Sequence, residues 1–401
     1  MHVVMVGNFG LGYKGTMAAR AIPIAHEIVR RGHMVTVIVP SDRDPVERHS
    51  RSAPDGPRII TVGPLPATLP GHLGAAARIV HAVLRARPDV LYAFKPKGYA
   101  GLALWLFWTL RRRGLTRAVL ALDTDDWEGA GGWLDKEPSP WWQRRLIAWQ
   151  EQWCLSHADI VTAASRELAS RVRAVRQAAE GVVYAPNAVS PASPGWRRGD
   201  GAPIRTALGL AERPIVLVYT RFVEFQPVRL LTVFEMVLQS RPEVCLLVVG
   251  AGLHGEERVF ARLARERGLA GAVRQVGWVK TGELPGFFAA ADIALYPLDD
   301  TLLNRAKCPM KLVDLLAAGV PVVADAVGQA REYIADGRTG LLVPPGDSIA
   351  MARRALALLE NPSWRHEISA AARSSMRERW TWERLAPAII RALEGAVGAR
   401  S

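Results

Sequence analysis

The feature that most constrains this chain is a regular alternation of short β-branched runs with longer helical stretches. In the first half the runs predict strands at residues 3–6, 34–39, 58–62, 90–94, 119–122, 159–163 and 182–185. Helical periodicity between them predicts helices at residues 16–30, 141–156 and 165–176. Strands that are apolar almost throughout and alternate with amphipathic helices indicate a parallel sheet covered on both faces.

The alternation stops at a stretch rich in Pro, Gly and Ser, residues 190–203, and then begins again. The second series predicts strands at residues 215–219, 244–249, 273–277, 293–296 and 320–324. We therefore expect two doubly wound domains, residues 1–195 and 196–375, and a C-terminal helix in residues 376–401 that packs back toward the first domain. Two such domains in tandem leave a cleft between the carboxyl ends of their sheets, where these folds bind ligands.

The composition excludes several other classes of protein. With 49% hydrophobic and 22% charged residues, both halves can bury a core. The longest apolar stretch, residues 101–110, is about half of what a bilayer span needs, and the first residues lack the pattern of a signal peptide. Cys154, Cys245 and Cys308 are widely spaced, so neither a disulfide framework nor a zinc site is expected. These features predict a cytoplasmic protein.

The net charge of +13 is compatible with an arginine-rich composition, an anionic membrane partner or nucleic acid. Only seven of the 51 basic residues are lysine, and the arginines are spread along the whole chain. This spread favours composition first and peripheral contact with the inner face of a membrane second, and no nucleic-acid motif is present. Residues 98–113, an apolar Trp-rich run followed by three arginines, suit either an interfacial helix or a buried helix with a basic end.

The strongest chemical signal is the loop, helix and strand predicted for residues 307–324. Lys311 and Asp314 lie three residues apart, on one helix face near its N-terminus, where backbone N–H groups suit a diphosphate. Lys311 or Lys307 can add positive charge, and Asp314 can accept hydrogen bonds from two ribose hydroxyls. A surface ion pair explains the same spacing, so charge alone leaves both interpretations open.

The sequence of this segment resembles the carboxylate–helix–Gly-x-Pro signature of the retaining family-4, group 1 glycosyltransferases, which have the GT-B fold. Asp314 takes the place of the acidic residue that holds the donor ribose in that family. Further matches follow in the same order over about 190 residues from Arg213 onward. The resemblance implies a GT-B fold of two Rossmann-like domains, with a nucleotide-diphosphate sugar held by the C-terminal one.

The resemblance also implies roles for individual residues of the second half. It places Arg221 on the donor phosphates, Gly252 in a second glycine turn and Val279 in the turn that borders the nucleobase. The donor site is completed by a set of residues from the later loops, namely Asn304, Lys307, Lys311, Asp314 and Glu332. Two positions depart from the family pattern, because a second motif carboxylate would fall on Ala306 and a usual lysine is Gln226. We expect Lys307 or Lys311 to substitute for that lysine.

Two loops of the first half carry weaker signals. Residues 7–15 form a glycine-rich loop after the first strand, in which Gly12 and Lys14 are candidates for ligand contact, although a bare tight turn explains the same pattern. Lys95 and Lys97 fall together in a Pro/Gly loop at the end of another predicted strand. Their ammonium groups suit phosphates, and solvated surface lysines are the alternative.

Residues 123–128 contain four carboxylates directly after a predicted strand. Three interpretations are open: contact with acceptor or donor sugar, with Asp125 as a catalytic candidate and Trp127 stacked on a sugar ring; a divalent metal site; or a solvated loop. The GT-B resemblance implies that no metal is needed and favours the first.

Taken together, the resemblance implies a hexosyltransferase. The donor would be a UDP- or GDP-sugar, the acceptor a hydroxyl of a glycan or lipid-linked molecule, and the anomeric configuration would be retained. Arg221, Lys311 and Asp125 are the catalytic candidates. Two alternatives remain: an isomerase like the UDP-sugar 2-epimerases, and a degenerate, non-catalytic GT-B partner subunit.

Overall fold

The protein is described from a computed structural model, which describes residues 1–12, 15–41, 50–52, 56–64 and 69–400. The chain divides into two compact units. The first consists of Met1–Asn187, Ala306–Cys308 and Trp382–Ser401, and the second of Ala188–Arg305 and Pro309–Thr381. The main passages between units therefore come after Asn187 and after Thr381, and residues 306–308 return briefly to the first unit. The sequence pattern places its divisions at residues 195 and 375.

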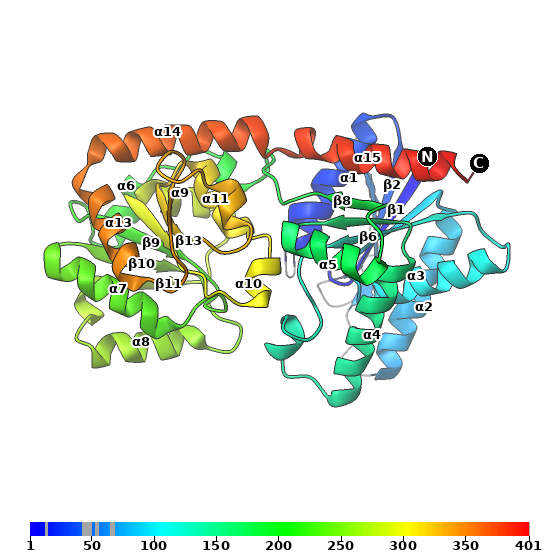
Figure 1. The fold of residues 1–401 in the computed structure, drawn as a ribbon, viewed down its shortest axis with the longest axis horizontal. Coiled ribbons are helices and arrows are strands. Elements are labelled where there is room, and N and C mark those ends of the chain that lie inside the picture. Colours follow the sequence, from blue (N-terminus) through cyan, green and yellow to red (C-terminus); the bar gives the residue numbers. More distant parts are fainter. Residues whose placement is uncertain (13–14, 42–49, 53–55, 65–68, 401) are drawn as a thin grey trace. The chain divides into compact units, whose positions relative to one another are not determined.

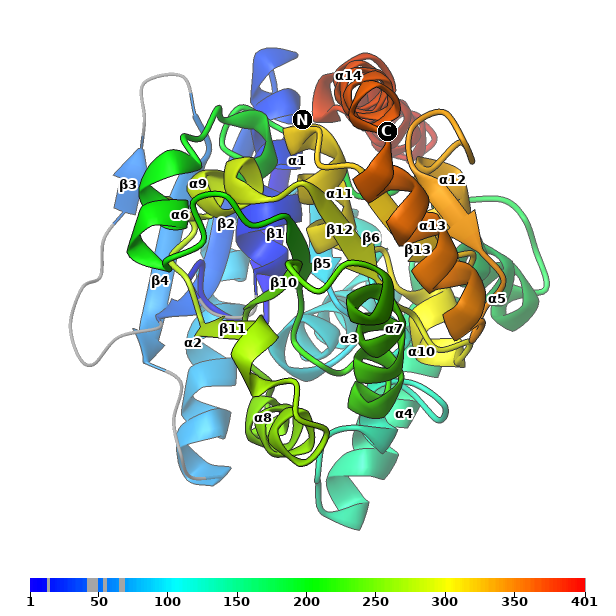
Figure 2. The ribbon, with the colours of Figure 1, turned by 90° about the vertical axis from the view of Figure 1, so that its left-hand side faces the viewer.

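The first unit is built on a sheet whose described strands follow the order β3-β4-β2-β1-β5-β6-β7-β8. All of its strand pairs are parallel except β3–β4. In Figure 2, β3, β4, β2 and β1 follow one another across the sheet. The strands are β1 (His2–Gly7), β2 (Met34–Ser41), β3 (Ser50–Ser52), β4 (Arg58–Pro64), β5 (Val90–Phe94), β6 (Val119–Thr124), β7 (Ile160–Ala163) and β8 (Val182–Tyr184).

Helices cover both faces of this sheet, as its apolar strands require. α1 and α15 pack on each other, as Figure 1 shows, while α2, α3, α4 and α5 pack on one another in succession. The helices are η1 (Met17–Ala21), α1 (Ile22–Arg30), α2 (Leu69–Ala86), α3 (Gly98–Arg112), η2 (Trp133–Asp135), α4 (Trp141–His157), α5 (Arg166–Arg176) and α15 (Trp382–Gly398).

The helix predicted for residues 16–30 is not a single α-helix. Its first part, η1, is a π-helical turn that runs directly into α1. The wider turn leaves Arg20 buried. π-turns of this kind are uncommon and often lie at functional sites, so periodicity alone did not reveal it.

The second unit is built on a parallel sheet whose described strands follow the order β11-β10-β9-β12-β13-β14. The strands are β9 (Ile215–Tyr219), β10 (Cys245–Val249), β11 (Val273–Gly277), β12 (Ile293–Tyr296), β13 (Val322–Asp325) and β14 (Leu341–Val343). α13 packs on α7 and α11 packs on α14. The helices are η3 (Pro194–Trp196), α6 (Ala202–Ala207), α7 (Pro227–Ser240), α8 (Glu256–Glu266), η4 (Ala270–Ala272), α9 (Leu284–Ala290), α10 (Leu302–Ala306), α11 (Met310–Ala318), α12 (Ala330–Tyr333), α13 (Ser348–Glu360) and α14 (Pro362–Arg379).

The strand orders confirm the predicted pair of doubly wound α/β folds and locate a switch point in each. In the first sheet the chain winds outward from β1 and then returns to β5 beside it. In the second sheet it winds outward from β9 and then returns to β12 beside it. Crevices at the carboxyl ends of such strand pairs are the usual ligand sites of this architecture.

Candidate functional site

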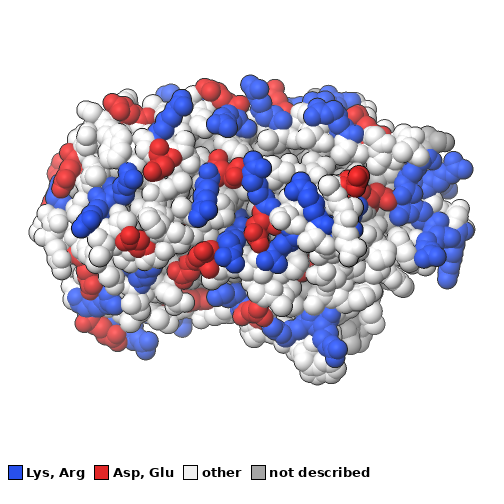
Figure 3. Space-filling view, in the orientation of Figure 1, with Lys and Arg blue, Asp and Glu red and all other residues white. Residues whose placement is uncertain are grey.

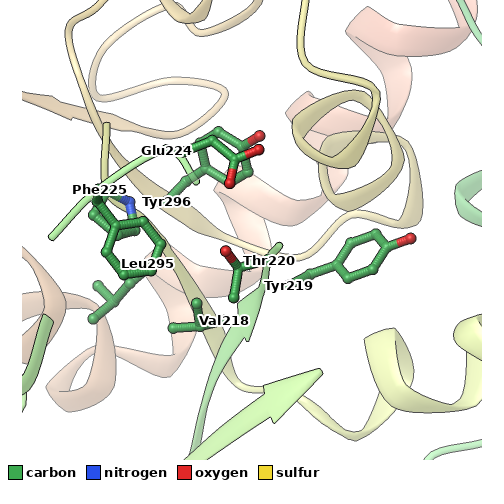
Figure 4. A pocket seen from close by; sticks show the side chains of 8 residues that line it. Val218, Tyr219, Thr220, Glu224, Phe225, Leu295 and Tyr296 are labelled. Carbon is green, nitrogen blue, oxygen red and sulfur yellow. The ribbon is translucent and has the colours of Figure 1, made fainter. Parts of the chain in front are cut away.

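A pocket opens at the switch point of the second unit. It spans about 190 Å³ of space not filled by atoms, part of which is open to solvent. Figure 4 shows its lining, in which the Tyr219 ring points away from the side on which Glu224 and Phe225 lie. The lining residues come from β9, the loop after it and the end of β12, namely Val218, Tyr219, Thr220, Glu224, Phe225, Leu295, Tyr296 and Pro297.

Three predicted site residues converge on Tyr219, the last residue of β9. The ammonium group of Lys311 lies 5.3 Å from the centre of the Tyr219 ring. Burial and the nearby Asp314 carboxylate raise the pKa of Tyr219, and the nearby Arg221 opposes that rise. Arg221, Lys311 and Asp314 therefore all lie near Tyr219 at this edge.

The side chain of Asp314 is shielded from solvent to a degree that is unusual for a carboxylate. It lies in the second turn of α11 and is 6% exposed. Its hydrogen bond from a described residue comes from the backbone N–H of Gly195, at 3.4 Å. Burial raises the pKa of Asp314 to about 7, although this hydrogen bond and Lys311 oppose the rise. A buried carboxylate with so few donors is suited to accept hydrogen bonds from a bound diol.

Gly195 closes over the α11 backbone at this point. A Cβ atom on Gly195 would lie 2.2 Å from the backbone oxygen of Asp314, so only glycine fits without a shift. The sequence pattern placed residue 195 in a linker. The backbone amide of Gly195 nevertheless donates to Asp314, the residue predicted to bind the donor ribose. In the local sequence, only the glycine between Pro194 and Trp196 indicated that this backbone could lie close to another segment.

The loop that follows β9 stores backbone strain. Phe222 is a buried, bulky residue with a φ of 61°, in the left-handed region that favours glycine. The Thr220 hydroxyl accepts a hydrogen bond of 2.7 Å from the Phe222 N–H. The Phe222 ring packs at 5.5 Å from Phe260 and 6.2 Å from Phe225. A conformation that costs about 1–3 kcal/mol persists only where the surroundings fix it, and such strain collects at ligand sites.

Asp325 organises the neighbouring loops, and sequence reasoning missed it. It is completely buried at the end of β13 and accepts two hydrogen bonds of 2.7 Å from the Arg229 guanidinium. Its oxygens also accept from the N–H groups of Leu298, after β12, and Gly346, after β14. This carboxylate therefore fixes the edge beside the pocket. An aspartate at the end of a predicted strand was the available signal.

Gly252 and Val279 follow the two neighbouring strands, β10 and β11, at the same edge. The N–H of Gly250 donates to the carbonyl of Gly277 at 2.7 Å, which joins the two turns. The Gly252 N–H donates to the carboxylate of Glu257 at 2.9 Å, so this amide is already engaged within its own turn. Val279 is half-buried.

Asn304 and Glu332 lie in the short helices α10 and α12, which follow β12 and β13. Asn304 is 4% exposed, and its amide nitrogen donates to the carbonyls of Glu224, at 2.6 Å, and Asp299, at 2.8 Å. Its Oδ1 is buried and has no hydrogen-bond partner among the described residues. Glu332 is half-buried in the first turn of α12. Asn304 therefore fixes the backbone of the pocket loop, and its Oδ1 atom is an acceptor that no described residue uses.

The carboxylates after β6 in the first unit are not a solvated loop. Lys95 is 8% exposed, and its ammonium group lies within 2.9 Å of both Asp125 and Asp126 and 3.1 Å from Glu128. Lys97 pairs with Glu128 at 2.5 Å. The neighbouring carboxylates engage both lysines, so the alternative of solvated surface lysines is wrong, and contact with a phosphate stays a prediction.

Asp125, the predicted catalytic residue of this loop, also accepts a hydrogen bond of 2.9 Å from the Thr16 hydroxyl. Burial raises its pKa, and Lys95 opposes the rise. The expectation that Trp127 offers a face to a sugar is wrong. This ring is 7% exposed, its N–H donates to the Ala130 carbonyl, and the Arg171 guanidinium lies over it at 5.2 Å. Within the described residues, no group of three or more His, Cys, Asp or Glu side chains is placed to hold a metal ion.

The remaining predicted residues belong to the first unit. Gly12 is exposed in a bend after β1, and Lys14 lies outside the described residues. Lys307 is 8% exposed, and its ammonium group lies 5.8 Å from the centre of the Trp133 ring. The segment around it is fixed by Ser165, which donates to the Ala306 carbonyl at 2.5 Å, and by Asn187, which donates to the Cys308 carbonyl at 2.6 Å. Lys307 and Lys311, predicted to act on the same phosphates, thus belong to different units.

Comparison with known proteins decides the family. Residues 213–361 match the family described as glycosyl transferases group 1, and residues 15–188 match the glycosyl transferase 4-like domain. This chain belongs to the group 1 glycosyl transferases. The motif region that carries Arg221, Lys311 and Asp314 lies inside the first of these matches, so the predicted family is confirmed.

Curated relatives of this group 1 glycosyl transferase are themselves sugar transferases. Over 246 residues it is 28% identical to the GDP-mannose-dependent alpha-(1-6)-phosphatidylinositol monomannoside mannosyltransferase of Mycolicibacterium smegmatis, an alignment that covers 61% of this chain and 64% of the relative. Over 427 residues it is 28% identical to the D-inositol 3-phosphate glycosyltransferase of a Nocardioides species, which covers 96% of this chain and 86% of the relative. The chain spans between 41% and 64% of the length of the mannosyltransferases that it matches.

Solved structures confirm the GT-B fold of this glycosyl transferase. Sucrose-phosphate synthase from Thermosynechococcus elongatus matches all of both chains with a TM-score of 0.74 at 20% identity. HepE of Anabaena, solved with UDP and glucose, covers 98% of this chain and 99% of its own, with a TM-score of 0.70 at 20% identity.

Proposed function

We propose that this protein transfers a hexosyl group from a nucleoside diphosphate sugar to a hydroxyl acceptor, with retention of the anomeric configuration. The observation that carries the proposal is the buried Asp314 carboxylate beside Lys311 and Arg221 at the carboxyl edge of the second sheet. The names of the mannosyltransferase relatives support a GDP-sugar, and the complex of HepE with UDP-glucose supports a UDP-sugar. GDP-mannose and UDP-glucose are therefore the first donors to test.

Each residue of this edge has a role in the proposal. Asp314 accepts hydrogen bonds from the two ribose hydroxyls, and burial strengthens these bonds because water does not compete. Arg221 and Lys311 stabilise the negative charge that develops on the departing diphosphate. Gly252, Val279, Asn304 and Glu332 complete the donor site. Lys307 or Lys311 substitutes for the lysine that the family usually has where this chain has Gln226.

Retention requires that the acceptor attacks from the face that the nucleotide leaves. We propose that the leaving phosphate takes the acceptor proton on that face, so that no separate base is needed. Asp125 is proposed to bind acceptor or sugar hydroxyls. A glycan or a lipid-linked polyol is the proposed acceptor class, since the names of the relatives include a phosphatidylinositol mannoside and an inositol phosphate. The proposal includes no metal ion.

Nucleotide release tests this proposal. Purified protein is incubated with GDP-mannose or UDP-glucose and a polyol acceptor such as inositol 3-phosphate, and free GDP or UDP is measured. We expect release that depends on acceptor, and loss of at least about 100-fold in Asp314→Asn and Lys311→Gln, since each change removes a contact to a charged group. Arg338→Gln, an exposed site in the same unit, is the matched control and should retain the wild-type rate.

Two other outcomes would contradict the proposal. Acceptor-independent conversion of a UDP-sugar to its epimer would favour the isomerase. No release with any donor, despite nucleotide binding, would favour the non-catalytic partner subunit.

A further inference from the structure

A set of large apolar side chains lies exposed on two neighbouring helices of the first unit, α3 and α4. A soluble surface rarely leaves so many tryptophans together in water. We call this set the tryptophan face, and its members are Trp105 (42% exposed), Trp141 (72%), Trp142 (46%), Leu146 (42%) and Trp149 (47%).

The spacing of these residues places most of them on one stripe. Trp142, Leu146 and Trp149 follow one another at intervals of four and three residues, which brings them to the same side of α4. Trp153, four residues further, meets Trp108 of α3 edge-on at 5.5 Å, and Trp149 lies 6.2 Å from Trp153. The exposed rings therefore continue a packed aromatic cluster that joins the two helices.

The fold does not need the exposed side of these helices. α3 is anchored to the sheet by its opposite side, where Tyr99, Leu104 and Phe107 are buried. α4 is anchored by its second half, where Cys154 and Leu155 are buried. The exposed tryptophans lie outside both anchors. Sequence reasoning left an interfacial and a buried helix open for residues 98–113, and α3 is buried on one side and exposed on the other.

The exposed charged side chains that α3 and α4 themselves carry have one sign, and Asp135, just before α4, pairs with Arg144. α3 contains no Asp or Glu, and the one acidic residue of α4, Glu151, is 1% exposed. Arg112 and Arg145 are exposed on these helices, and the exposed Arg113 directly follows α3. The Arg112 guanidinium lies 5.0 Å from the centre of the Trp108 ring, which places positive charge directly beside the aromatic cluster. In Figure 3 an uncharged tip projects at the lower edge of this unit, with basic side chains beside it.

We infer that the tryptophan face docks this protein on an anionic membrane surface. Tryptophan prefers the level of the lipid headgroups because its ring is apolar and its N–H is polar, and arginine pairs with the lipid phosphates above it. In the part of the chain that the structure describes, no helix is long and apolar enough to cross a bilayer, so the proposed contact is peripheral.

A second copy of the chain is a poorer occupant of the same face. A two-fold dimer through this face would bring the arginines of both copies together, and no exposed carboxylate of α3 or α4 would offset them. An anionic lipid surface supplies the missing negative charge together with an apolar interior for the rings.

Vesicle flotation tests the inference with the full chain. The vesicles consist of phosphatidylcholine alone or with about one third phosphatidylglycerol. We expect binding to the anionic vesicles that weakens as salt is raised, and little binding to phosphatidylcholine alone. Trp142→Ala/Trp149→Ala should reduce the bound fraction at least about tenfold. Arg112→Gln/Arg145→Gln should reduce the affinity roughly 25-fold, since each basic residue near an anionic surface contributes about a fivefold factor.

Matched controls carry equivalent changes on the second unit. Ile349→Ser removes an exposed apolar side chain (53% exposed), and Arg262→Gln/Arg353→Gln removes two exposed charges. Both should bind vesicles as the wild type does. Leu146→Ser is a second probe of the face if the double tryptophan variant fails to fold. Thermal unfolding of every variant shows whether the fold is retained.

Three results would overturn the inference. The first is wild-type protein that stays in the unbound fraction at low salt, and the second is flotation of the face variants equal to that of the controls. The third is a dimer, seen by sedimentation without lipid, that Trp142→Ala/Trp149→Ala dissociates. That result would assign the face to a second copy of the chain.

Discussion

Arg20 and Asp123 form a buried ion pair at the centre of the first unit. Both side chains are 1% exposed, and the guanidinium donates to both carboxylate oxygens, at 2.7 and 2.8 Å. Arg20 also donates to the Asn187 side chain at 3.2 Å and lies 5.4 Å from the centre of the Trp382 ring. This single pair therefore connects the π-turn η1, strand β6, the end of the first chain segment and helix α15.

Loss of the Asp123 charge should destabilise the first unit strongly. Asp123→Asn leaves the Arg20 guanidinium buried without its counter-charge, which typically costs about 3–5 kcal/mol. Urea unfolding measures the loss. Asp135→Asn is the matched control, because Asp135 pairs with Arg144 at a well-exposed site and should lose less than about 1 kcal/mol. A loss as small as the control's in Asp123→Asn would contradict the proposed role of the pair.

The raised pKa of Asp314 predicts a pH dependence of stability. The folded-state pKa is about 7 and the ordinary value is 3.8, so protonation of this carboxyl favours folding. That contribution is complete below about pH 4 and is lost as pH rises through about 7. Asp314→Asn, which does not ionise, should therefore exceed the wild type in free energy of unfolding at pH 8, by at most about 4 kcal/mol.

The difference between Asp314→Asn and the wild type should shrink steadily toward pH 4. Urea unfolding at several pH values between 4 and 8 measures it. Asp300→Asn removes an aspartate whose side chain is 49% exposed and should leave the pH profile unchanged. A gap between Asp314→Asn and the wild type that does not vary with pH would show that Asp314 does not titrate in this range.

Gly268 and Gly250 allow the free-energy cost of an unfavourable backbone conformation to be measured apart from the cost of a steric clash. Gly268 has a φ of 73° with open space around a Cβ, so Gly268→Ala should cost about 1 kcal/mol through conformation alone. Gly250 has a φ of 120°, and a Cβ there would lie 1.9 Å from the Thr220 carbonyl oxygen. Gly250→Ala should therefore cost several times as much and should weaken nucleotide binding, because it pushes on the loop after β9. Equal losses in urea unfolding would contradict this geometry.

Most of the fold could be predicted from sequence because most of its strands are buried on both faces and are apolar almost throughout. β3 escaped prediction because Ser50–Ser52 contains three polar residues and pairs only at the sheet edge. β14 was not predicted as a strand because Leu341–Val343 has only three residues, fewer than the roughly four to eight apolar residues that indicate a strand.

The candidate site was predicted in part. Lys311 and Asp314 were placed correctly on one helix because their spacing is local. The burial of Lys95 and Trp127 depends on how the loop after β6 closes over them, and local sequence contains no signal for that closure. Tyr219 was noted only as the end of a strand, since its contact with Lys311 joins residues 92 positions apart.

Nucleotide affinity should rise with pH through the pKa of Asp314. Ribose hydroxyls donate to the ionised carboxylate, so binding favours the charged form and releases a proton. Titration calorimetry of the preferred nucleoside diphosphate between pH 6 and 8 should give tighter binding at the higher pH. Asp314→Asn should bind more weakly and lose this dependence. Equal pH dependence in the wild type and Asp314→Asn would place the titrating group elsewhere.

The most direct test of the central claim is thermal unfolding with UDP, GDP, ADP and dTDP in the absence of metal. A nucleotide at about 100 times its dissociation constant adds roughly 2.7 kcal/mol to the native state, which raises the midpoint by several degrees. We predict that UDP or GDP produces this shift in the wild type and not in Asp314→Asn. No shift with any of the four nucleotides, or an equal shift in Asp314→Asn, would contradict a nucleotide-sugar site at the carboxyl edge of the second sheet.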